Sequence, residues 1–280
     1  ILSSFFAGIT SVLAKYGIRK TDSDIVTALR TIVVLIFSWL IVLLSGAASG
    51  IGGIETKTLI FLILSGIATG GSWLCYFRAL QLGNVNKVTP IDKSSTILTM
   101  ILAFIFFHEQ ISALKILCIA LIGIGTYMMI ENKGDGKEAS GKSSWLLWTV
   151  LSAVFAALTA IFGKVGITGI DSNLGTAIRT IVVLLMSWLV VFVTKSGGEL
   201  HNVNRRSLFF LVTSGLATGL SWLAYYKALQ TGPASIVVPI DKLSIWVTIF
   251  FSCVVLKEKM TKKSWLGLSL LTVGTLLLLV

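Results

Sequence analysis

The sequence predicts an all-α membrane protein with ten transmembrane helices, arranged as two inverted five-helix repeats. Of its 280 residues, 55% are hydrophobic and only 12% are charged, whereas about a quarter of the residues of a soluble domain are charged. The apolar residues form runs that approach the ~20 residues a helix needs to cross a ~30 Å hydrocarbon layer. These runs lack the period-two alternation of a membrane β-barrel, and the chain contains a long internal repeat.

Hydrophobic segments define the predicted helices. They lie at residues 1–18, 25–45, 58–82, 85–107, 112–130, 145–167, 173–194, 207–231, 234–256 and 263–280. Between the fifth and the sixth lies a polar linker, residues 131–144 (ENKGDGKEASGKSS), which separates a first repeat, 1–130, from a second, 145–280. Ile1 already lies inside a hydrophobic run, so we expect the natural start of the protein to precede it.

The internal repeat has a constant spacing and needs no gaps. The segment TALRTIVVL at 27–35 returns as TAIRTIVVL at 176–184, which is 149 residues later. At the same spacing, SGIATGGSWLCYFRALQLG at 65–83 returns as SGLATGLSWLAYYKALQTG at 214–232, and TPIDKSS at 89–95 returns as VPIDKLS at 238–244. Such long matches indicate gene duplication.

An odd number of helices in each repeat predicts that the two repeats have opposite orientations in the membrane. Inverted repeats recur in secondary transporters, where substrate sites lie at the repeat interface and one repeat moves against the other. The loops on one face are predicted to contain Arg19, Lys20, Lys87, Lys133, Lys137, Lys142, Lys195, Arg205, Arg206, Lys257, Lys259, Lys262 and Lys263, and those on the other face only Lys57 and Lys115. Because basic loops stay in the cytoplasm, we expect a cytoplasmic linker, both ends of the sequence outside, and a location in the plasma or inner membrane.

Eight basic residues and two acids fall inside the predicted spans, at matching positions of the repeats. The first set is Lys15, Arg30, Arg78, Asp92 and Lys93, and the second set is Lys164, Arg179, Lys227, Asp241 and Lys242. Charges inside a bilayer are costly and usually face a bundle interior or a watery cavity. At 1.5 Å per residue, the first set lies roughly 5–12 Å inside the cytoplasmic boundary, and inversion places the second set at the same depth on the outer side.

Two interpretations fit these charges. In the first, long side chains reach the lipid headgroups from near the helix ends; the candidates are Lys15, Lys164, Arg78 and Lys227. In the second, each set is an ion-paired gate that closes one end of a pathway, with Asp92 paired to Arg30 or a neighbouring cation and Asp241 paired to Arg179. The short reach of a carboxylate favours the gate, although inheritance through duplication also explains the symmetry.

Pro90 and Pro239 are predicted helix breaks. Pro233 suits the first turn of the ninth helix, so Pro239 falls inside that helix and removes a backbone hydrogen bond. A break followed directly by Asp and Lys resembles the broken helices that bind solutes in transporters. The alternative is that both prolines start their helices and that the acids interact with the helix dipole.

Small polar residues form stripes at helical spacing, which predicts a polar path between helices 1–4 and 6–9, with helices 5 and 10 peripheral. The predicted lining residues are Ser65, Thr69, Ser72, Trp73 and Tyr76 in the third helix and Ser214, Thr218, Ser221, Trp222 and Tyr225 in the eighth. A further stripe in the fourth helix consists of Asp92, Ser95, Thr96 and Thr99. The alternative is that the serines and threonines only join helices to one another.

Several motifs together resemble the EamA-type branch of the drug/metabolite transporter superfamily over essentially the whole chain. They are the two five-helix halves, a glycine-rich third helix ending in SWLxYxxAL, and a fourth helix ending in an acid (Phe107-His108-Glu109 and Leu256-Lys257-Glu258). The TAIRTIVVL and PIDK segments are similar to a subgroup also found as single five-helix proteins. The resemblance implies ten helices around a central cavity and the export or exchange of metabolites, amino acids or drugs. It also implies cytoplasmic termini, in conflict with the loop charges.

The buried excess of cations favours a carrier of a small anionic or zwitterionic metabolite, such as an amino acid or organic acid, that works by alternating access. One alternative is a proton-coupled exporter of organic cations or drugs, with aromatic cages for the cation and Asp92 and Asp241 as proton carriers. Another, of a different class, is a lipid-handling or accessory membrane subunit. We expect a small-molecule substrate and the lipid bilayer as partners, protons in the first alternative, a functional monomer, and no nucleic acid, cofactor or metal.

An enzyme is not expected. The histidines, His108 and His201, lie outside the predicted spans, and the sequence has no nucleophile–base pair, metal motif or nucleotide-binding loop. Cys75, Cys118 and Cys253 lie in apolar segments without metal-type spacing and are interpreted as packing residues. The net charge of +11 is scattered between hydrophobic runs, which indicates topology signals rather than a nucleic-acid-binding patch.

Overall fold

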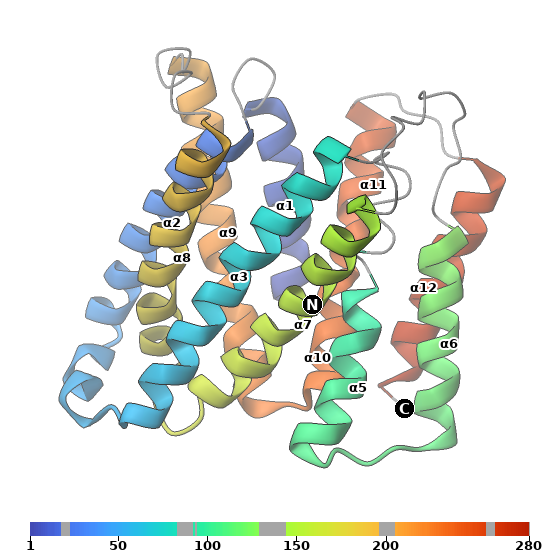
Figure 1. Ribbon diagram of the computed structural model, residues 1–280, viewed down its shortest axis with the longest axis horizontal. Coiled ribbons are helices and arrows are strands. Elements are labelled where there is room, and N and C mark those ends of the chain that lie inside the picture. Colours follow the sequence, from blue (N-terminus) through green and yellow to red (C-terminus); the bar gives the residue numbers. More distant parts are fainter. Residues whose placement is uncertain are drawn as a thin grey trace.

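The computed structural model describes residues 1–17, 23–82, 92, 94–128, 144–195, 205–255 and 261–279. All regular structure in these residues is helical (Figure 1). The first half of the chain forms α1 (Leu2–Gly17), α2 (Ser23–Leu44), the 3-10 helix η2 (Ala47–Gly53), α3 (Thr56–Leu82), α5 (Ser95–Phe107) and α6 (Ala113–Met128). The second half forms α7 (Ser144–Gly166), α8 (Ser172–Thr194), α9 (Arg205–Thr231), α10 (Ala234–Lys242), α11 (Ser244–Val255) and α12 (Lys262–Leu277).

The helices have the length and surface of membrane-spanning segments. In the described part of the chain, five stretches are long and apolar enough to cross a bilayer: Asp24–Leu44, Thr56–Tyr76, Trp145–Gly166, Ser172–Thr194 and Ser207–Thr231. Large apolar side chains point outward from these helices; Leu185 is 66% exposed, Phe192 81% and Phe209 63%. Apolar surface of this extent fits contact with lipid rather than water. The chain is therefore a multi-pass helical membrane protein.

Most predicted spans coincide with a helix to within a few residues, and two differ. The span predicted at 234–256 consists of two helices, α10 and α11, which meet at Leu243. In the span predicted at 85–107, α5 begins only at Ser95, and residues 83–91 lie outside the described part. The predicted linker, 131–144, lies outside the described residues except for Ser144, the first residue of α7.

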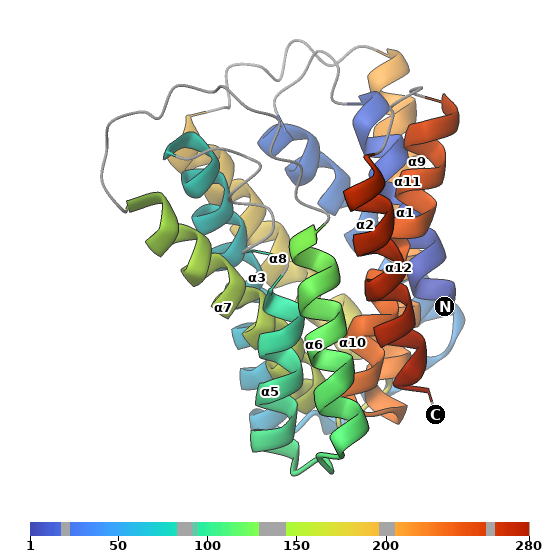
Figure 2. The same cartoon turned by 90° about the vertical axis from the view of Figure 1, so that its right-hand side faces the viewer.

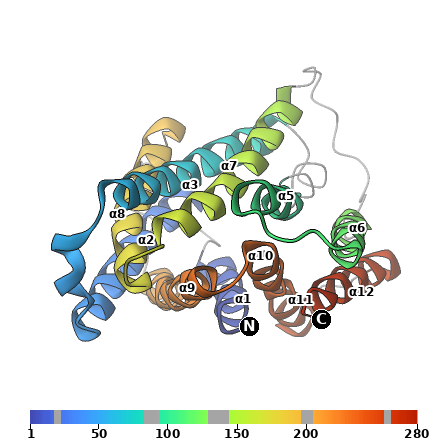
Figure 3. The same cartoon turned by 90° about the horizontal axis from the view of Figure 1, so that it is seen from below.

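The most extensive helix contacts join the two halves of the chain, whereas contacts within each half are smaller. Helix α3 lies against α7 and α8, and α9 lies against α1 and α2. Helices α2 and α8 pack together at one edge of the bundle, and α6 and α12 pack together at the opposite edge (Figures 1 and 3). Figure 2 shows α3 and α7 inclined relative to α1 and α9, so that the two groups converge toward the end drawn at the bottom, called the lower end below.

Glycines permit the close approach of α3 and α9 to their neighbours. A Cβ at Gly66 would lie 2.6 Å from the Cβ of Val182 on α8, and a Cβ at Gly215 would lie 2.7 Å from the Cβ of Val33 on α2. Small residues let helix backbones come this close. Since these residues occupy matching positions of the sequence repeat, the α3–α8 and α9–α2 contacts have the same register.

Candidate functional site

Helix α10 ends at an interruption that positions two charged side chains. Leu243 has helical dihedrals, but its N–H donates to the carbonyl three residues earlier at 3.0 Å. Pro239 was predicted to lie inside its helix, with a break just before Asp241 and Lys242; its place inside the helix is confirmed, but the predicted position of the break was wrong. Pro239 lies inside α10, and the break follows Asp241 and Lys242, because a nine-residue helix loses only one internal hydrogen bond to the proline. Pro90 lies outside the described residues.

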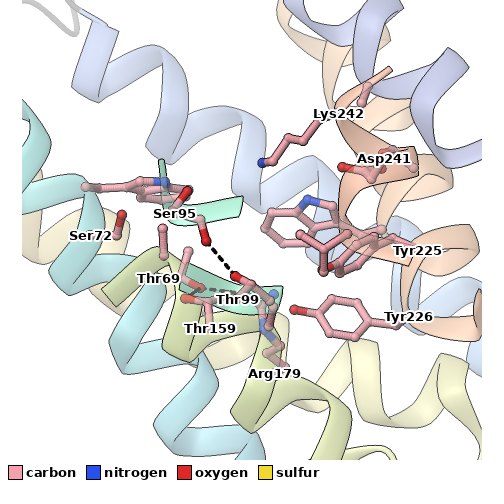
Figure 4. Close-up of a pocket in the computed structure, with 17 residues that line it drawn as sticks. Thr69, Ser72, Ser95, Thr99, Thr159, Arg179, Tyr225, Tyr226, Asp241 and Lys242 are labelled. Carbon is pink, nitrogen blue, oxygen red and sulfur yellow. Dashed lines mark hydrogen bonds between the residues drawn. The ribbon is translucent and has the colours of Figure 1, made fainter. Parts of the chain in front are cut away.

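A cavity of about 310 Å³ lies beside the end of α10 (Figure 4). Its lining comes from α1, α3 and α5 of the first half and from α7, α8, α9 and α10 of the second. None of its described lining residues comes from α6 or α12, which the sequence predicted to be peripheral. The lining includes the predicted residues Thr69, Ser72, Trp73, Ser95, Thr99, Arg179, Ser221, Trp222, Tyr225, Asp241 and Lys242.

Other predicted lining residues lie behind the cavity wall. Ser65, Ser214 and Thr218 are buried, Tyr76 is half-buried, and none of the four is among the described lining residues. The Ser65 hydroxyl donates to the Thr159 carbonyl at 2.8 Å, which joins α3 to α7. For Ser65, the alternative of a helix-joining contact therefore describes the structure better than direct cavity lining.

Arg179 is the most deeply buried cation of the cavity wall, with an exposure of only 2%. Its Nε donates to Ser65 Oγ at 2.9 Å, and its Nη2 donates to Thr69 Oγ1 at 2.5 Å. The guanidinium carbon lies 5.1 Å from the ring centroid of Trp222 and 4.9 Å from that of Tyr226. Its third nitrogen, Nη1, is buried and has no hydrogen-bond partner in the part of the chain that the structure describes.

The two predicted acids, Asp92 and Asp241, are half-buried and bind serines of the other half of the chain. Ser152 on α7 donates to Asp92 at 2.6 Å, and Ser3 on α1 donates to Asp241. The predicted pairing of Asp241 with Arg179 was wrong, because Arg179 donates to hydroxyls and Asp241 accepts from Ser3. Neutral hydroxyls on adjacent helices are close enough to form hydrogen bonds with both groups, whereas the sequence could not reveal which helices are adjacent.

The remaining predicted charges have different surroundings. Arg30 is half-buried on α2, outside the cavity lining. Arg78 and Lys227 are exposed near the ends of α3 and α9, which fits the interpretation that long side chains reach the headgroups. Lys242 lines the cavity with Asp241, and Figure 4 shows its ammonium directed toward the cavity space. Lys93 and the side chain of Lys15 lie outside the described residues.

A second charged site, the Glu109 cluster, lies at the lower end of the bundle, where α5 ends and α10 begins (Figure 1). The Glu109 carboxylate accepts from the backbone N–H groups of Ala234 and Ser235 at 2.8 and 3.2 Å, and from the Ser235 hydroxyl. Lys164 forms an ion pair with it at 3.3 Å and donates to the Gly232 carbonyl at 2.8 Å. A carboxylate of the first half therefore caps the positive N-terminus of α10 and joins α7 to α10.

The local backbone explains how Glu109 reaches α10. His108 ends α5 in the left-handed region, at φ 50°, which turns the chain sharply at the end of the helix. Burial by itself raises the pKa of Glu109, but the hydrogen bonds from Ser235 and Ala234 and the charge of Lys164 outweigh it. The net pKa lies below its ordinary value, so Glu109 is a carboxylate at neutral pH.

The sequence matches one protein family along nearly its whole length. The pattern of the EamA-like transporter family matches residues 1–131 and again residues 143–280. The chain belongs to the EamA-like transporter family. An uncharacterized transporter of Sinorhizobium sp, named for the cobO 3' region, is 46% identical over 137 residues, which are 49% of this chain and 97% of that protein. The family match therefore occurs once in each half.

More distant relatives are also uncharacterized transporters, and one solved structure has a similar fold. An uncharacterized transporter of Archaeoglobus fulgidus is 22% identical over 81% of this chain and 78% of its own length. The uncharacterized transporter YxxF of Bacillus subtilis is 22% identical over 57% of this chain, which spans only 50% of that protein. A crystal structure 13% identical in sequence superposes with a TM-score of 0.74 over 99% of this chain and 93% of its own, which shows a shared fold.

Several residues of the site in this EamA-type protein were not predicted from its sequence. Ser3, Ser152 and Thr159 lie on the first helix of each half, for which no polar stripe was predicted, and Tyr226 follows the predicted Tyr225. A usable signal was the repeat itself, because Ser3 and Ser152 match at the 149-residue spacing. Glu109 was noted only as part of a family motif, and no sequence signal indicates that it caps α10.

Proposed function

We propose that this protein is a secondary transporter of a small anionic or zwitterionic metabolite, and that Arg179 binds the carboxylate of the substrate. The observation that carries the proposal is the buried guanidinium in the cavity wall. Arginine stays charged in proteins, and a buried charge without a counter-charge is unfavourable. Arg179 contacts neutral hydroxyls and aromatic rings, while Nη1 lacks a partner in the described structure. A substrate carboxylate supplies both the counter-charge and an acceptor.

The cavity also favours a particular substrate size and charge. A volume of about 310 Å³ is at the lower end of the roughly 300–1,000 Å³ typical of ligand pockets, which fits a metabolite of few atoms. The described lining contains two cations, Arg179 and Lys242, and one acid, Asp241. This balance suits a carboxylate near Arg179, and Asp241 is available to a substrate ammonium group. An amino acid or a small organic acid meets both conditions.

The alternative of an organic-cation exporter is less well supported. Its aromatic cage would need free ring faces, but the rings of Trp222 and Tyr226 already contact the guanidinium of Arg179. Asp241 lines the cavity and accepts from Ser3. It is a candidate carrier of a coupling proton whether the substrate is an organic cation or a carboxylate. Because the described lining contains two cations and one acid, the cavity favours an anionic or zwitterionic substrate.

We further propose that the ten predicted helices form two inverted halves that alternate access to the cavity. Equivalent contacts in the two halves support this arrangement. Ser152 donates to Asp92 as Ser3 donates to Asp241, and Gly66 contacts α8 as Gly215 contacts α2. The half-length Sinorhizobium relative is consistent with a duplicated unit. The excess of basic residues in one set of loops favours a cytoplasmic linker in the plasma or inner membrane.

Ligand-induced stabilisation of the purified protein tests the substrate class. We expect L-alanine, L-glutamate or succinate to raise the melting temperature of the native protein and choline to leave it unchanged. A ligand at 100 times its Kd stabilises a protein by about 2.7 kcal/mol. Arg179→Gln should weaken the effect, and Arg179→Lys should weaken it less, because lysine keeps the charge but loses the two-pronged geometry.

Lys227→Gln is the matched control, since Lys227 is exposed and lies outside the cavity lining. It should respond to carboxylates like the native protein. Stabilisation by choline alone, or a carboxylate response that Arg179→Gln leaves at its native strength, would contradict the proposal.

A further inference from the structure

Several hydrogen bonds around the cavity occur in pairs that follow the sequence repeat. Thr69 and Thr159 lie 3.3 Å apart, and their repeat counterparts Thr218 and Thr10 also lie 3.3 Å apart. Ser72 donates to the Ser152 carbonyl at 3.1 Å, as Ser221 donates to the Ser3 carbonyl at 3.0 Å. The two halves therefore have matching polar contacts at these positions.

Arg179 and Arg30, which occupy matching positions of the repeat, do not form matching hydrogen bonds. Arg179 donates to Ser65 and Thr69, whose repeat counterparts are Ser214 and Thr218. Arg30, the counterpart of Arg179, does not donate to Ser214: the Ser214 hydroxyl has no hydrogen-bond partner in the described residues, although Ser214 is only 1% exposed. A buried hydroxyl without a partner is destabilising. This conformation thus satisfies one hydroxyl pair and leaves part of the other unsatisfied.

The backbone already positions Arg30 for the second pair. The Arg179 carbonyl lies 3.3 Å from a Cβ built at Gly66, next to Ser65, and the Arg30 carbonyl lies 3.2 Å from a Cβ built at Gly215, next to Ser214. The two arginines therefore start from equivalent points relative to the two hydroxyl pairs. Arg30 is half-buried rather than fully buried, so its side chain needs to move, whereas the contact between α2 and α9 does not.

We propose that Ser214 and Thr218 bind the guanidinium of Arg30 in the opposite conformation of the transporter, and that Arg30 there takes over from Arg179 as the carboxylate-binding residue. The inference rests on the proposed function, because it assigns the substrate-binding group of the second state. Each arginine has its own pair of hydroxyl acceptors, and in each conformation only one of the two arginines is hydrogen-bonded to its pair. A substrate carboxylate is then bound by Arg179 in this conformation and by Arg30 in the opposite one.

Two serine substitutions should shift the conformational equilibrium in opposite directions. Ser65→Ala removes an acceptor of Arg179 and should favour the opposite conformation. Ser214→Ala removes the acceptor for Arg30 and should favour the conformation described above. The loss of one hydrogen bond to a charged group corresponds to a population change of roughly tenfold.

Cysteine accessibility measures this shift. Cys75, Cys118 and Cys253 are replaced by alanine, Ala156 in the cavity wall is replaced by cysteine, and a membrane-impermeant maleimide is added to right-side-out or inside-out vesicles. The ratio of the two labelling rates should rise for one serine variant and fall for the other. Ser38→Ala and Ser187→Ala are matched controls, since each hydroxyl donates to its own helix, and they should leave the ratio unchanged.

A double-mutant cycle then identifies Arg30 as the partner of Ser214. Arg30→Gln alone should shift the ratio in the same direction as Ser214→Ala, and the double variant should shift it no further, because both changes remove one interaction. Shifts of equal sign for Ser65→Ala and Ser214→Ala, no shift, or additive effects of Arg30→Gln and Ser214→Ala would each overturn the exchange. These results are separate from the carboxylate-binding test, which depends on Arg179 and added solutes and can fail while the accessibility shifts are observed.

Discussion

Arg179 owes its position to contacts from two neighbouring helices and to the absence of a side chain on a third. Ser65 on α3 accepts from it, and Tyr226 on α9 contacts it. Tyr226 fits because residue 163 on α7 is glycine: a Cβ at Gly163 would lie 2.7 Å from Tyr226 Cε1 and 3.3 Å from Ser65 Oγ. The absence of a side chain at Gly163 therefore leaves room for the Tyr226 ring beside the guanidinium.

Gly163→Ala should destabilise the protein and weaken its response to carboxylates, because the added methyl group displaces Tyr226 from Arg179. Overpacking of this kind costs about 1–3 kcal/mol, which thermal unfolding of the purified protein measures. Gly52→Ala is the control, since a Cβ there would have no heavy atom within 4 Å. Equal melting temperatures for the two variants would show that Tyr226 is free to move.

Helix α10 is the element that connects the cavity to the lower end of the bundle. It has nine residues and contains a proline, whereas isolated helices shorter than ~12–15 residues are marginal in water. Its first turn binds Glu109, and its last turn contributes Asp241 and Lys242 to the cavity. A change at the Glu109 cluster therefore has a direct structural route to the cavity residues.

Glu109→Gln should lower the stability of the protein at neutral pH, since it removes the charge that caps α10 and pairs with Lys164. Hydrogen bonds to charged groups contribute roughly 1.5–3 kcal/mol each. The folded-state pKa of Glu109 lies below the ordinary value of 4.5, so its stabilising contribution is complete above that value and is lost as the pH falls through the lowered pKa. The melting-temperature difference between the native protein and Glu109→Gln should therefore narrow on acidification below pH 4.5.

Glu55→Gln provides the control for this titration. Glu55 is an exposed carboxylate directly before α3, and its substitution should leave the melting temperature nearly unchanged. If the melting-temperature difference between Glu109→Gln and the native protein stayed constant from pH 7 to pH 4, the carboxylate at the α10 N-terminus would be excluded as the source of the stability difference.

At the scale of the whole molecule, the main apolar core belongs to both halves of the chain. It combines Leu62 and Ala103 of the first half with residues of the second half, including Ile161, Ile167 and Leu229. Helix α3 packs against α7 and α8, and α9 against α1 and α2. The two repeats are therefore structurally interdependent, although the sequence repeat suggests two self-contained units.

Cleavage between the repeats should leave the assembled protein intact. With a protease site inserted into the linker, 131–144, we expect the two fragments to copurify in mild detergent after cutting, because the contacts between halves do not depend on the covalent connection. The carboxylate response should also persist. Separation of the fragments under conditions in which the uncut protein stays folded would contradict this expectation.

The sequence predicted the helices well, the site residues in part, and the contacts between them poorly. Hydrophobic length predicted the long helices, because a bilayer imposes the same requirement on every spanning segment. The repeat and the buried charges selected Arg179, Asp241 and Lys242, which the structure brings to one cavity. The predicted partner of Asp241 was wrong, since the neighbours of a buried charge depend on which helices touch.

The sequence by itself determined the class of protein, the duplication and the positions of charges within hydrophobic segments, because these follow from local composition and from spacing along the chain. Only the tertiary structure decided that Ser65 and Thr69 bind Arg179, that Ser214 lacks a partner among the described residues, and that Glu109 caps α10. Such contacts join residues that are far apart in sequence, and their existence depends on the packing of α3, α8, α9 and α10 rather than on any local pattern.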